Sequence, residues 1–180
     1  MTSRLLQLHA KSDLIDRPTL CRWMRVVIDH CRRGVAQGQN PFAAAVYAAD
    51  GKQLSLEFNE VRRTGRPSHH AEVMAIDKAC LAIGGFELRD GDWLVTSGEP
   101  CPMCAATAAS VGIRHIAFGA AKETIEIAGY GKLGSGCEKI FPFFGREANI
   151  IGGIEEDDCA KLLVENPAPR SPSPKRSERG

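Results

Sequence analysis

The sequence predicts an α/β fold in which helices cover both faces of a mixed or parallel sheet. Short apolar runs typical of strands alternate with longer segments whose apolar residues recur at helical spacing. Glycine-containing turns, such as Asp50-Gly51 and Gly84-Gly85, separate these segments. The 180 residues suffice for one domain of ordinary size with a sizeable core, and they contain no internal repeat.

Four elements are predicted in the first half of the chain: a helix over 19–36, strands over 42–48 and 53–61, and a helix over 70–83. The first helix has apolar residues at helical spacing, although Gly34 is unfavourable inside it. Asp50-Gly51 is a strong hairpin signal between the two strands. Leu54, Leu56 and Phe58 alternate along the second strand, as expected for a strand with one buried face.

Five elements are predicted in the second half: a strand over 93–97, a helix over 103–111, strands over 113–120 and 148–154, and a helix over 155–164. Asp90-Gly91-Asp92 leads into the first of these strands, and Gly112 ends the alanine-rich helix. Pro102 stands where the first turn of a helix tolerates proline. Strands joined by helices in this order favour helices on both faces of the sheet.

Charge and cysteine content favour a reducing compartment and no particular partner. The formal net charge is +1, so bulk electrostatics selects no polyanion or membrane surface. Of the seven cysteines only Cys101 and Cys104 are closely spaced, which is not a disulfide framework. No apolar run approaches the ~20 residues of a membrane helix, and the start shows no secretory leader pattern. We therefore expect a cytoplasmic location and no membrane partner.

The chain divides into a predicted domain over 1–165 and a Pro/Ser/Arg-rich tail over 166–180. The tail holds four prolines and almost no apolar residue, so it is predicted to be disordered. A solvated tail without a role and a basic contact for nucleic acid or an acidic partner both fit this composition.

Two short motifs carry the chemistry, His70-Ala71-Glu72 and Pro100-Cys101-Pro102-Met103-Cys104. Zn²⁺ prefers four-coordinate sites of nitrogen and sulfur ligands, and a catalytic site keeps one position for water. Cys101 and Cys104 are three residues apart, so at a helix start both sulfurs face the same way. With His70 from another segment they form a predicted set of three zinc ligands.

Glu72 is the carboxylate of the set that does not bind the metal. Two residues after His70, it can reach a metal-activated water and serve as general acid and base, which is worth roughly 10²–10⁴-fold in rate. The pattern H-x-E followed by P-C-x-x-C is the signature of zinc-dependent nucleobase deaminases. The two motifs therefore predict hydrolytic deamination with Glu72 as the catalytic group.

Other interpretations of the cysteine pair remain open. A lone C-x-x-C is also found in redox pairs and in structural zinc sites, which want four protein ligands. Pro100, Pro102 and the upstream His-x-Glu favour a catalytic site. A catalytically silent zinc-binding module, tethered to a partner by the tail, is the non-enzymatic alternative. The intact Glu72 argues against it, because a structural site has no use for an unliganded acid.

From about Thr19 to Val164 the chain resembles the cytidine deaminase-like superfamily, and within it the small bacterial guanine and nucleoside deaminases. The stretches that carry the resemblance are Asn40-Pro41-Phe42-Ala43-Ala44-Ala45-Val46, Phe58-Asn59-Glu60-Val61, His70-Ala71-Glu72-Val73-Met74-Ala75-Ile76 and Thr96-Ser97-Gly98-Glu99-Pro100-Cys101-Pro102-Met103-Cys104. The resemblance implies a three-layer α/β/α fold with a five-stranded mixed sheet, one zinc ion per subunit and usually a homodimer.

The resemblance also assigns residues that contact the substrate. Asn59 matches a side chain that hydrogen-bonds the base, the backbone N–H of Ala71 matches a second contact, and Phe42 matches a residue near the pocket floor. A capping or turn role for Asn59 remains open. His69, next to the ligand His70, is expected to line the pocket wall or support the site rather than to bind metal.

The implied substrate is a free purine-type base, nucleoside or related aminated heterocycle, with guanine-type substrates favoured. Guanine deaminases of this kind carry an aspartate shortly after an Ala-Gly-Phe or Ile-Gly-Phe turn. This chain has Ala128-Gly129-Tyr130-Gly131-Lys132 there, and Glu126 and Glu138 are candidates to replace the missing acid. Tyr130 either stacks on the substrate ring or anchors its loop.

Two other deaminase substrates remain open, cytosine or another pyrimidine, and adenosine in tRNA. In the tRNA adenosine deaminases the last helix continues into aromatic and arginine residues. Here it breaks off at Asn166-Pro167, without the aromatic side chains that usually hold unstacked bases. Nucleic acid is therefore the less favoured partner, although it is not excluded.

The glycine-rich stretch 129–136 predicts a flexible lid over the pocket. A phosphate-binding loop is a weaker interpretation, because no strand-loop-helix frame with a trailing Lys-Ser/Thr surrounds it. Phe141, Phe143 and Phe144 follow the stretch. We expect them in the core of the same subunit, ahead of the pocket roof or a neighbouring subunit's pocket.

Overall fold

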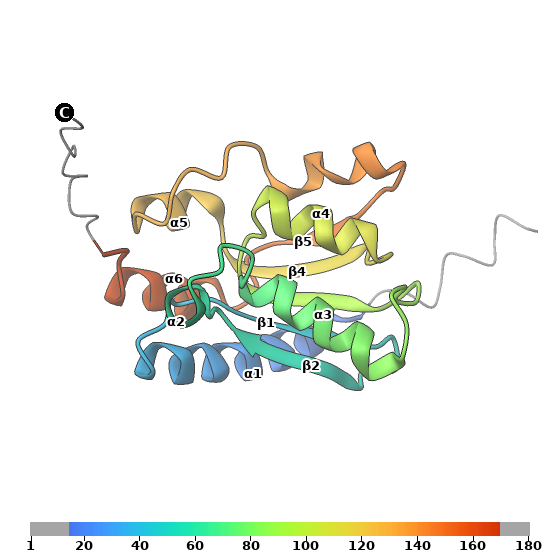
Figure 1. Cartoon of the computed structure of the whole chain (residues 1–180), viewed down its shortest axis with the longest axis horizontal. Coiled ribbons are helices and arrows are strands. Elements are labelled where there is room, and N and C mark those ends of the chain that lie inside the picture. Colours follow the sequence, from blue (N-terminus) through green and yellow to red (C-terminus); the bar gives the residue numbers. More distant parts are fainter. Residues whose placement is uncertain (1–14, 170–180) are drawn as a thin grey trace, which may run out of the picture.

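A five-stranded mixed sheet forms the middle of three layers in the computed structural model, which describes residues 15–169 (Figure 1). The strands are β1 (Ala43–Tyr47), β2 (Gln53–Phe58), β3 (Trp93–Gly98), β4 (His115–Ala120) and β5 (Asn149–Ile151). Their spatial order is β2-β1-β3-β4-β5. β1 pairs antiparallel with β2 and β3, whereas β3, β4 and β5 are parallel. The predicted α/β/α class and mixed sheet are confirmed.

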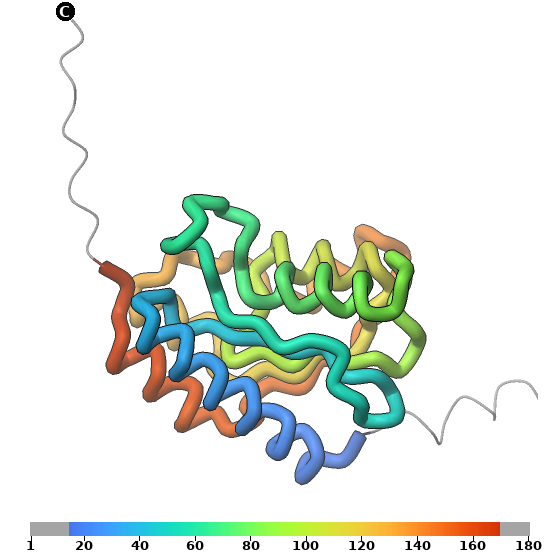
Figure 2. The backbone as a smooth tube through the Cα atoms, turned by 60° about the horizontal axis from the view of Figure 1, so that its bottom comes forward, coloured from blue at the N-terminus to red at the C-terminus, as the bar shows by residue number. Residues whose placement is uncertain are grey.

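Helices cover both faces of this sheet. They are α1 (Arg17–Ala36), α2 (Val61–Thr64), α3 (Ala71–Ile83), α4 (Pro102–Ser110), α5 (Lys122–Ile127) and α6 (Glu156–Glu165), with 3₁₀ turns η1 (Cys137–Lys139) and η2 (Phe141–Phe144). Figure 2 shows α1 and α6 side by side on one face, and α3 and α4 on the other. The short α2 and α5 lie at one end of the sheet (Figure 1).

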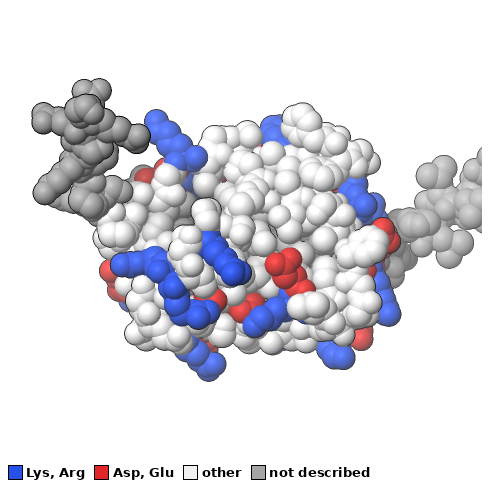
Figure 3. Space-filling view, viewed as in Figure 1, with Lys and Arg blue, Asp and Glu red and all other residues white. Residues whose placement is uncertain are grey.

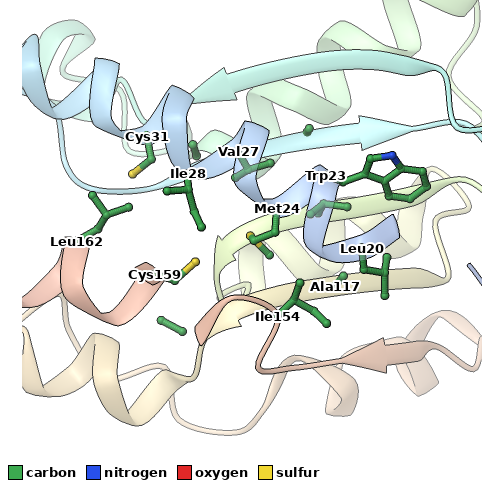
Figure 4. Packing of buried hydrophobic residues seen from close by; sticks show 14 of the residues in the cluster. Leu20, Trp23, Met24, Val27, Ile28, Cys31, Ala117, Ile154, Cys159 and Leu162 are labelled. Carbon is green, nitrogen blue, oxygen red and sulfur yellow. The ribbon is translucent and has the colours of Figure 1, made fainter. Parts of the chain in front are cut away.

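The sheet divides the core in two because successive strand residues point to opposite faces. Ala43, Ala45 and Tyr47 of β1 pack with the α1–α6 cluster, whereas Ala44 and Val46 pack with the α3–α4 cluster. Figure 4 shows the first cluster, where apolar side chains of α1 face those of α6 and β4. Because both faces of β1 are buried, its sequence is a continuous apolar run rather than an alternating one.

Gly34, unfavourable for a helix, is explained by packing between α1 and β2. A Cβ atom at this position would lie 2.7 Å from Cγ of Phe58. Non-bonded carbon atoms do not approach this closely in a well-packed core. Only glycine, which has no Cβ, therefore allows α1 to lie this close to the Phe58 ring. The neighbouring His30 ring lies 5.1 Å from the Phe58 ring, between centroids.

Several predicted boundaries differ from the structure for local reasons. The return strand predicted to reach 61 ends at Phe58, because Asn59 begins a turn into α2. The strand predicted over 148–154 is only Asn149–Ile151, and Gly153 turns the chain with φ +72°. The short helices α2 and α5 and the two 3₁₀ turns were not predicted.

The three phenylalanines after the glycine-rich stretch differ in burial. Phe141 is fully buried in the α3–α4 cluster, which confirms the expected core position. Phe143 and Phe144 are exposed. The core prediction is therefore wrong for these two, because η2 is a single short turn that can bury only one of its faces.

The predicted tail begins with residues that contact the domain. The backbone N–H of Ala168 donates to the carbonyl oxygen of Ala128 at 2.9 Å. The hydroxyl of Tyr130 donates to the carbonyl oxygen of Asn166 at 2.5 Å. Residues 170–180, the rest of the predicted tail, lie outside the described residues, as do residues 1–14 of the predicted domain. Within 15–169, no helix is both long and apolar enough to cross a membrane.

Candidate active site

Four segments that carry the site meet at one edge of the sheet. β2 and β3 are both antiparallel to β1, so they end at the edge where β1 begins. β4 is parallel to β3 and ends there too. Asn59 follows β2, Glu99 follows β3, and Phe42 precedes β1. This edge, at the carboxyl ends of parallel strands, is the usual place for a ligand site in α/β proteins.

The predicted metal ligands stand at the starts of two helices. His70 is the N-cap residue of α3, and Cys101 is the N-cap residue of α4, both with extended backbone angles. Cys104 lies in the first turn of α4 and is fully buried. Helix N-termini carry partial positive charge and unpaired N–H groups, so both helices favour thiolate at this point.

The three ligand atoms form a compact triangle. Sγ of Cys101 lies 3.5 Å from Sγ of Cys104 and 3.7 Å from Nδ1 of His70. Sγ of Cys104 lies 3.5 Å from the same nitrogen. Tetrahedral zinc with Zn–S bonds of ~2.3 Å and a Zn–N bond of ~2.0–2.1 Å would place such atoms roughly 3.5–3.8 Å apart. The donor set and its spacing therefore fit zinc, as predicted.

The three predicted ligands shift one another's pKa values. Contact with the Cys104 thiol, together with His70, lowers the pKa of Cys101 to about 4. Hydrogen bonding to Cys101 and burial raise the pKa of Cys104. Contact with Cys101 also raises the pKa of His70. One thiolate therefore forms readily, and a bound cation is needed to stabilise the second.

Glu72 lies in the first turn of α3 and is buried, with 5% of its surface exposed. Burial, and then the charge of Cys101, raises the pKa of its carboxyl to about 7. A carboxyl that titrates near neutral pH can both accept and return a proton, which suits a general acid and base. Among the described residues it is not a member of the metal-binding triangle.

A pocket opens in front of this triangle, with a cavity volume of about 120 Å³. It is lined by Asn40, Phe42, Asn59, His70, Glu72, Glu99, Cys101, Ile125, Tyr130 and Leu133. Six of these are predicted site residues, which the fold brings together from five separate segments. The volume lies below the ~300–1,000 Å³ typical of drug-sized ligands, so the pocket suits a small ligand.

Asn59 serves the backbone and also lines the pocket. Its side-chain oxygen accepts a hydrogen bond from the N–H of Val61 at 3.1 Å, which is the turn role that the sequence left open. Its backbone N–H donates to the carbonyl of Phe42 at 2.9 Å. The side chain is thereby held in one orientation at the pocket wall.

Phe42 and Tyr130 form an aromatic corner of the pocket. Their ring centroids lie 5.0 Å apart and the planes are nearly perpendicular, at 85°. A Cβ at Gly98 would lie 3.2 Å from Phe42 and 3.0 Å from Ile125, so glycine leaves room for both. The hydroxyl of Tyr130 bonds to Asn166, so this residue anchors its loop.

Other candidates lie outside the pocket. Ala71 and Cys104 are fully buried and do not line it. Glu126 accepts a hydrogen bond from the N–H of Leu133 at 3.0 Å, and Glu138 is half exposed. Neither lines the pocket, so neither takes the place of the missing lid aspartate in this structure. His69 lies outside the metal-binding triangle, with Nε2 3.5 Å from Arg66.

The lining includes four residues that the sequence did not single out, Asn40, Glu99, Ile125 and Leu133. Asn40 and Glu99 belong to motif stretches that carry the family resemblance, so their position was a usable signal. Ile125 belongs to α5, which neither spacing nor motif marks as part of a site, whereas Leu133 lies in the glycine-rich stretch 129–136 that was predicted to be a lid.

Residues 18–120, with the whole metal triangle inside, match the family model for the cytidine and deoxycytidylate deaminase zinc-binding region. The chain belongs to this deaminase family. The match confirms the predicted zinc cofactor and the resemblance.

Relatives of this deaminase differ in substrate. The tRNA-specific adenosine deaminase of Bacillus subtilis is 28% identical over 147 residues, covering 78% of this chain and 84% of the relative. The tRNA(Ile)-lysidine synthase of Deinococcus radiodurans is 34% identical over 125 residues, covering 69% of this chain. The deaminase spans only 20% of that synthase, so the similarity concerns one region of a longer protein.

Solved structures share the fold of the deaminase over most of its length. The guanine deaminase of Nitrosomonas europaea is 26% identical and has a TM-score of 0.74, with 94% of each chain covered. A mutant protein solved in complex with 8-azaguanine is also 26% identical with a TM-score of 0.74, covering 82% of this chain and 83% of that one.

Proposed function

We propose that this deaminase acts on a free purine-type base, nucleoside or related aminated heterocycle, with guanine-type substrates favoured. It would replace the exocyclic amine by oxygen and release ammonia. The observation that carries the proposal is the buried Glu72, which lines the same small pocket as the ligands His70 and Cys101.

The zinc ligands and Glu72 have different roles in the proposed reaction. His70, Cys101 and Cys104 would hold zinc, which would supply a water activated as a nucleophile near neutral pH. Glu72 takes a proton from the attacking water and delivers protons to the ring nitrogen and the departing amine. A C–O bond forms, the C–N bond breaks, and water and substrate yield product and ammonia. No oxidant, reductant or further cofactor is required.

The residues around the pocket suggest how the substrate is bound. The amide of Asn59 presents hydrogen-bonding groups to a planar base, and its oxygen is already fixed by Val61. The N–H of Ala71, at the first turn of α3, is one of the donors that a helix start leaves unpaired; Ala71 does not line the pocket, so this contact is proposed on the family resemblance alone. Phe42 and Tyr130 supply apolar ring surface. A pocket of about 120 Å³ favours a base over a bulkier ligand.

The test is an ammonia-release assay on zinc-loaded protein. The panel holds guanine, guanosine, adenine, adenosine, cytosine, cytidine, aminated triazines and pterins. Release from a purine-type compound, abolished in Glu72→Gln, supports the proposal. Release from cytosine or cytidine alone contradicts the purine preference. Silence on the whole panel with zinc bound favours the catalytically silent module.

Adenosine in tRNA is the second candidate, because the Bacillus subtilis tRNA-specific adenosine deaminase matches 78% of this chain. Lys and Arg side chains also gather over α2, beside the pocket (Figure 3). An adenosine-containing anticodon stem-loop belongs in the same assay. Turnover of the stem-loop without turnover of free bases would replace the proposed substrate.

A homodimer is proposed on the family resemblance and on one surface. Met103, Phe143 and Phe144 are exposed, and the surface over α4 carries few charged side chains (Figure 3). Large apolar side chains that are exposed together often mark an interface. Light scattering of the purified protein tests the proposal, and a monomer mass contradicts it. We also propose a cytoplasmic location and a role in purine metabolism.

A further inference from the structure

Glu99 is a buried carboxylate that the proposed reaction does not use. It stands two residues before the ligand Cys101, and only 9% of its surface is exposed. Its Oε2 accepts a hydrogen bond from the N–H of Lys122, and its Oε1 accepts one from the N–H of Cys137, both at 3.1 Å. Its own N–H donates to the carbonyl of Ala120 at 2.8 Å.

These bonds fix both ends of one chain segment. Residues 122 and 137 bound the pocket wall, which we define as Lys122–Cys137. This wall supplies Ile125, Tyr130 and Leu133 to the pocket. Each end is therefore attached to the same carboxylate, and that carboxylate belongs to the loop that carries Cys101.

Within the pocket wall, further hydrogen bonds restrain the glycine-rich stretch that was predicted to be a lid. Glu126 accepts from the N–H of Leu133 at 3.0 Å. The ammonium group of Lys122 donates to the carbonyl of Gly134 at 2.9 Å. The wall is thus internally braced, and its position relative to the metal loop depends on its two attached ends.

We propose that Glu99 is a positioning residue that sets the distance between the metal loop and the pocket wall, and so determines how tightly the heterocycle is held. The inference rests on the proposed function, because it concerns the same pocket. Glu99 also lies close to Cys137 and Glu138, a grouping that resembles a metal site. Both of its oxygens already accept backbone N–H groups, which favours the positioning role.

The carboxylate is difficult to replace at this position. The N–H groups of Lys122 and Cys137 both donate to it, so the side chain at position 99 must offer two acceptor oxygens. Glutamine has the same shape but would direct an N–H at one of the two donors, and one hydrogen bond would be lost. Alanine would leave both buried N–H groups without an acceptor, which costs more.

The experiment compares Glu99→Gln with Glu57→Gln in the full-length zinc-bound protein. Glu57, on the outer strand β2, pairs with Lys78 of α3 and does not line the pocket, so it controls for the loss of a part-buried carboxylate. The readouts are zinc content, hydrogen exchange at the amides of Lys122 and Cys137, the Kd of 8-azaguanine, and KM and kcat on the substrate found in the ammonia assay.

Glu99→Gln is expected to keep its zinc and to exchange the two amides faster. The Kd of 8-azaguanine and KM should rise at least about tenfold, the loss expected for one buried hydrogen bond to a charged acceptor, while kcat changes less. Glu57→Gln should match the unaltered protein. A purely structural role would lower Tm but leave Kd and KM unchanged at a permissive temperature, and that result overturns the proposal. Loss of zinc together with activity also overturns it, because Glu99 would then support the metal.

Glu99→Asp keeps the proposal testable if Glu99→Gln does not fold. It keeps both acceptor oxygens on a side chain shorter by one methylene, so the attached ends must shift, and the Kd of 8-azaguanine should rise without loss of zinc; an unchanged Kd contradicts the proposal. If the unaltered protein neither turns over a heterocycle nor binds 8-azaguanine, the proposed function fails. The exchange rates at Lys122 and Cys137 then still decide whether Glu99 holds the wall.

Discussion

His70 and Cys101 occupy the same position on two different helices: each is the N-cap residue, and their ligand atoms lie 3.7 Å apart. The starts of two helices therefore position two of the three predicted zinc ligands. Because α3 and α4 are packed against the same face of the sheet, a shift of either helix would change the ligand triangle.

The metal triangle predicts which substitutions lose zinc. His70→Ala, Cys101→Ser and Cys104→Ser should each bind zinc much more weakly, because three protein ligands leave no spare donor. His69→Ala should keep a full complement, since His69 lies outside the triangle. Metal content by plasma emission spectrometry checks both statements. Zinc retained in all three ligand variants would disprove the assignment.

Glu72→Gln separates metal binding from catalysis. The amide keeps the shape of the side chain but cannot accept the proton from water, so kcat should fall by roughly 10²–10⁴-fold. Zinc should stay bound, because Glu72 is not a ligand. Full activity in this variant would refute the proton-transfer role. Ammonia release and metal content, measured on the same preparation, give the answer.

Gly34→Ala should destabilise the protein by about 1–3 kcal/mol, as overpacking of a filled core does. The added methyl would lie 2.7 Å from Cγ of Phe58, between α1 and β2. Gly85→Ala is the matched control, because nothing lies within 4 Å of its Cβ position. Urea unfolding followed by circular dichroism measures both variants. Equal midpoints would contradict the close approach.

The cap of α1 predicts a pH-dependent contribution to stability. Hydrogen bonds from Thr19 hold the pKa of Asp16 below its usual 3.8. A group whose pKa is lower in the folded state stabilises the protein above its unfolded-state pKa, and this stabilisation is lost as pH falls through the folded-state value. Asp16→Ala should therefore lower Tm at pH 7, and the difference should shrink below pH 3.8. Asp16→Asn, which keeps a neutral cap, should show a smaller difference at pH 7.

Tyr130 predicts two separable effects. Tyr130→Phe removes the hydrogen bond to Asn166 but keeps the ring against Phe42, so stability should fall by about 0.5–1.5 kcal/mol with little change in KM. Tyr130→Ala also removes the ring from the pocket and should raise KM. If the two variants have the same KM, the ring does not contribute to binding. Thermal unfolding and steady-state kinetics distinguish the cases.

The sequence predicted the metal site well because its residues are local to two helix starts. His-x-Glu and Cys-x-x-Cys spacing places the side chains within each helix start, and the packing of α3 and α4 against the same face of the sheet brings the two motifs together. The order of strands along the chain was readable because turn residues such as Asp50-Gly51 and Gly112 separate the apolar runs. Glu99 shows the limit: its role depends on residues 122 and 137, which only tertiary packing brings to it.

Short elements were the least predictable part. α2 has four residues and α5 has six, too few for a periodic pattern to be visible. α2 depends on the side chain of Asn59, whose oxygen holds the N–H of Val61. In the sequence Gly34 is only an unfavourable residue inside a helix. Its need becomes clear in the structure, where Phe58 packs against it.

The contacts of Asn166 and Ala168 have a practical consequence for handling this protein. α6 is the last helix of the described residues and ends at Glu165, so a truncation after this residue would keep every helix and strand that the structure describes. Such a truncation would remove the acceptor for the Tyr130 hydroxyl and the donor to the Ala128 carbonyl. A loss of activity in a shortened protein would then reflect a loosened pocket rather than a missing catalytic group. Protein preparations for assay or crystallisation should extend beyond Ala168.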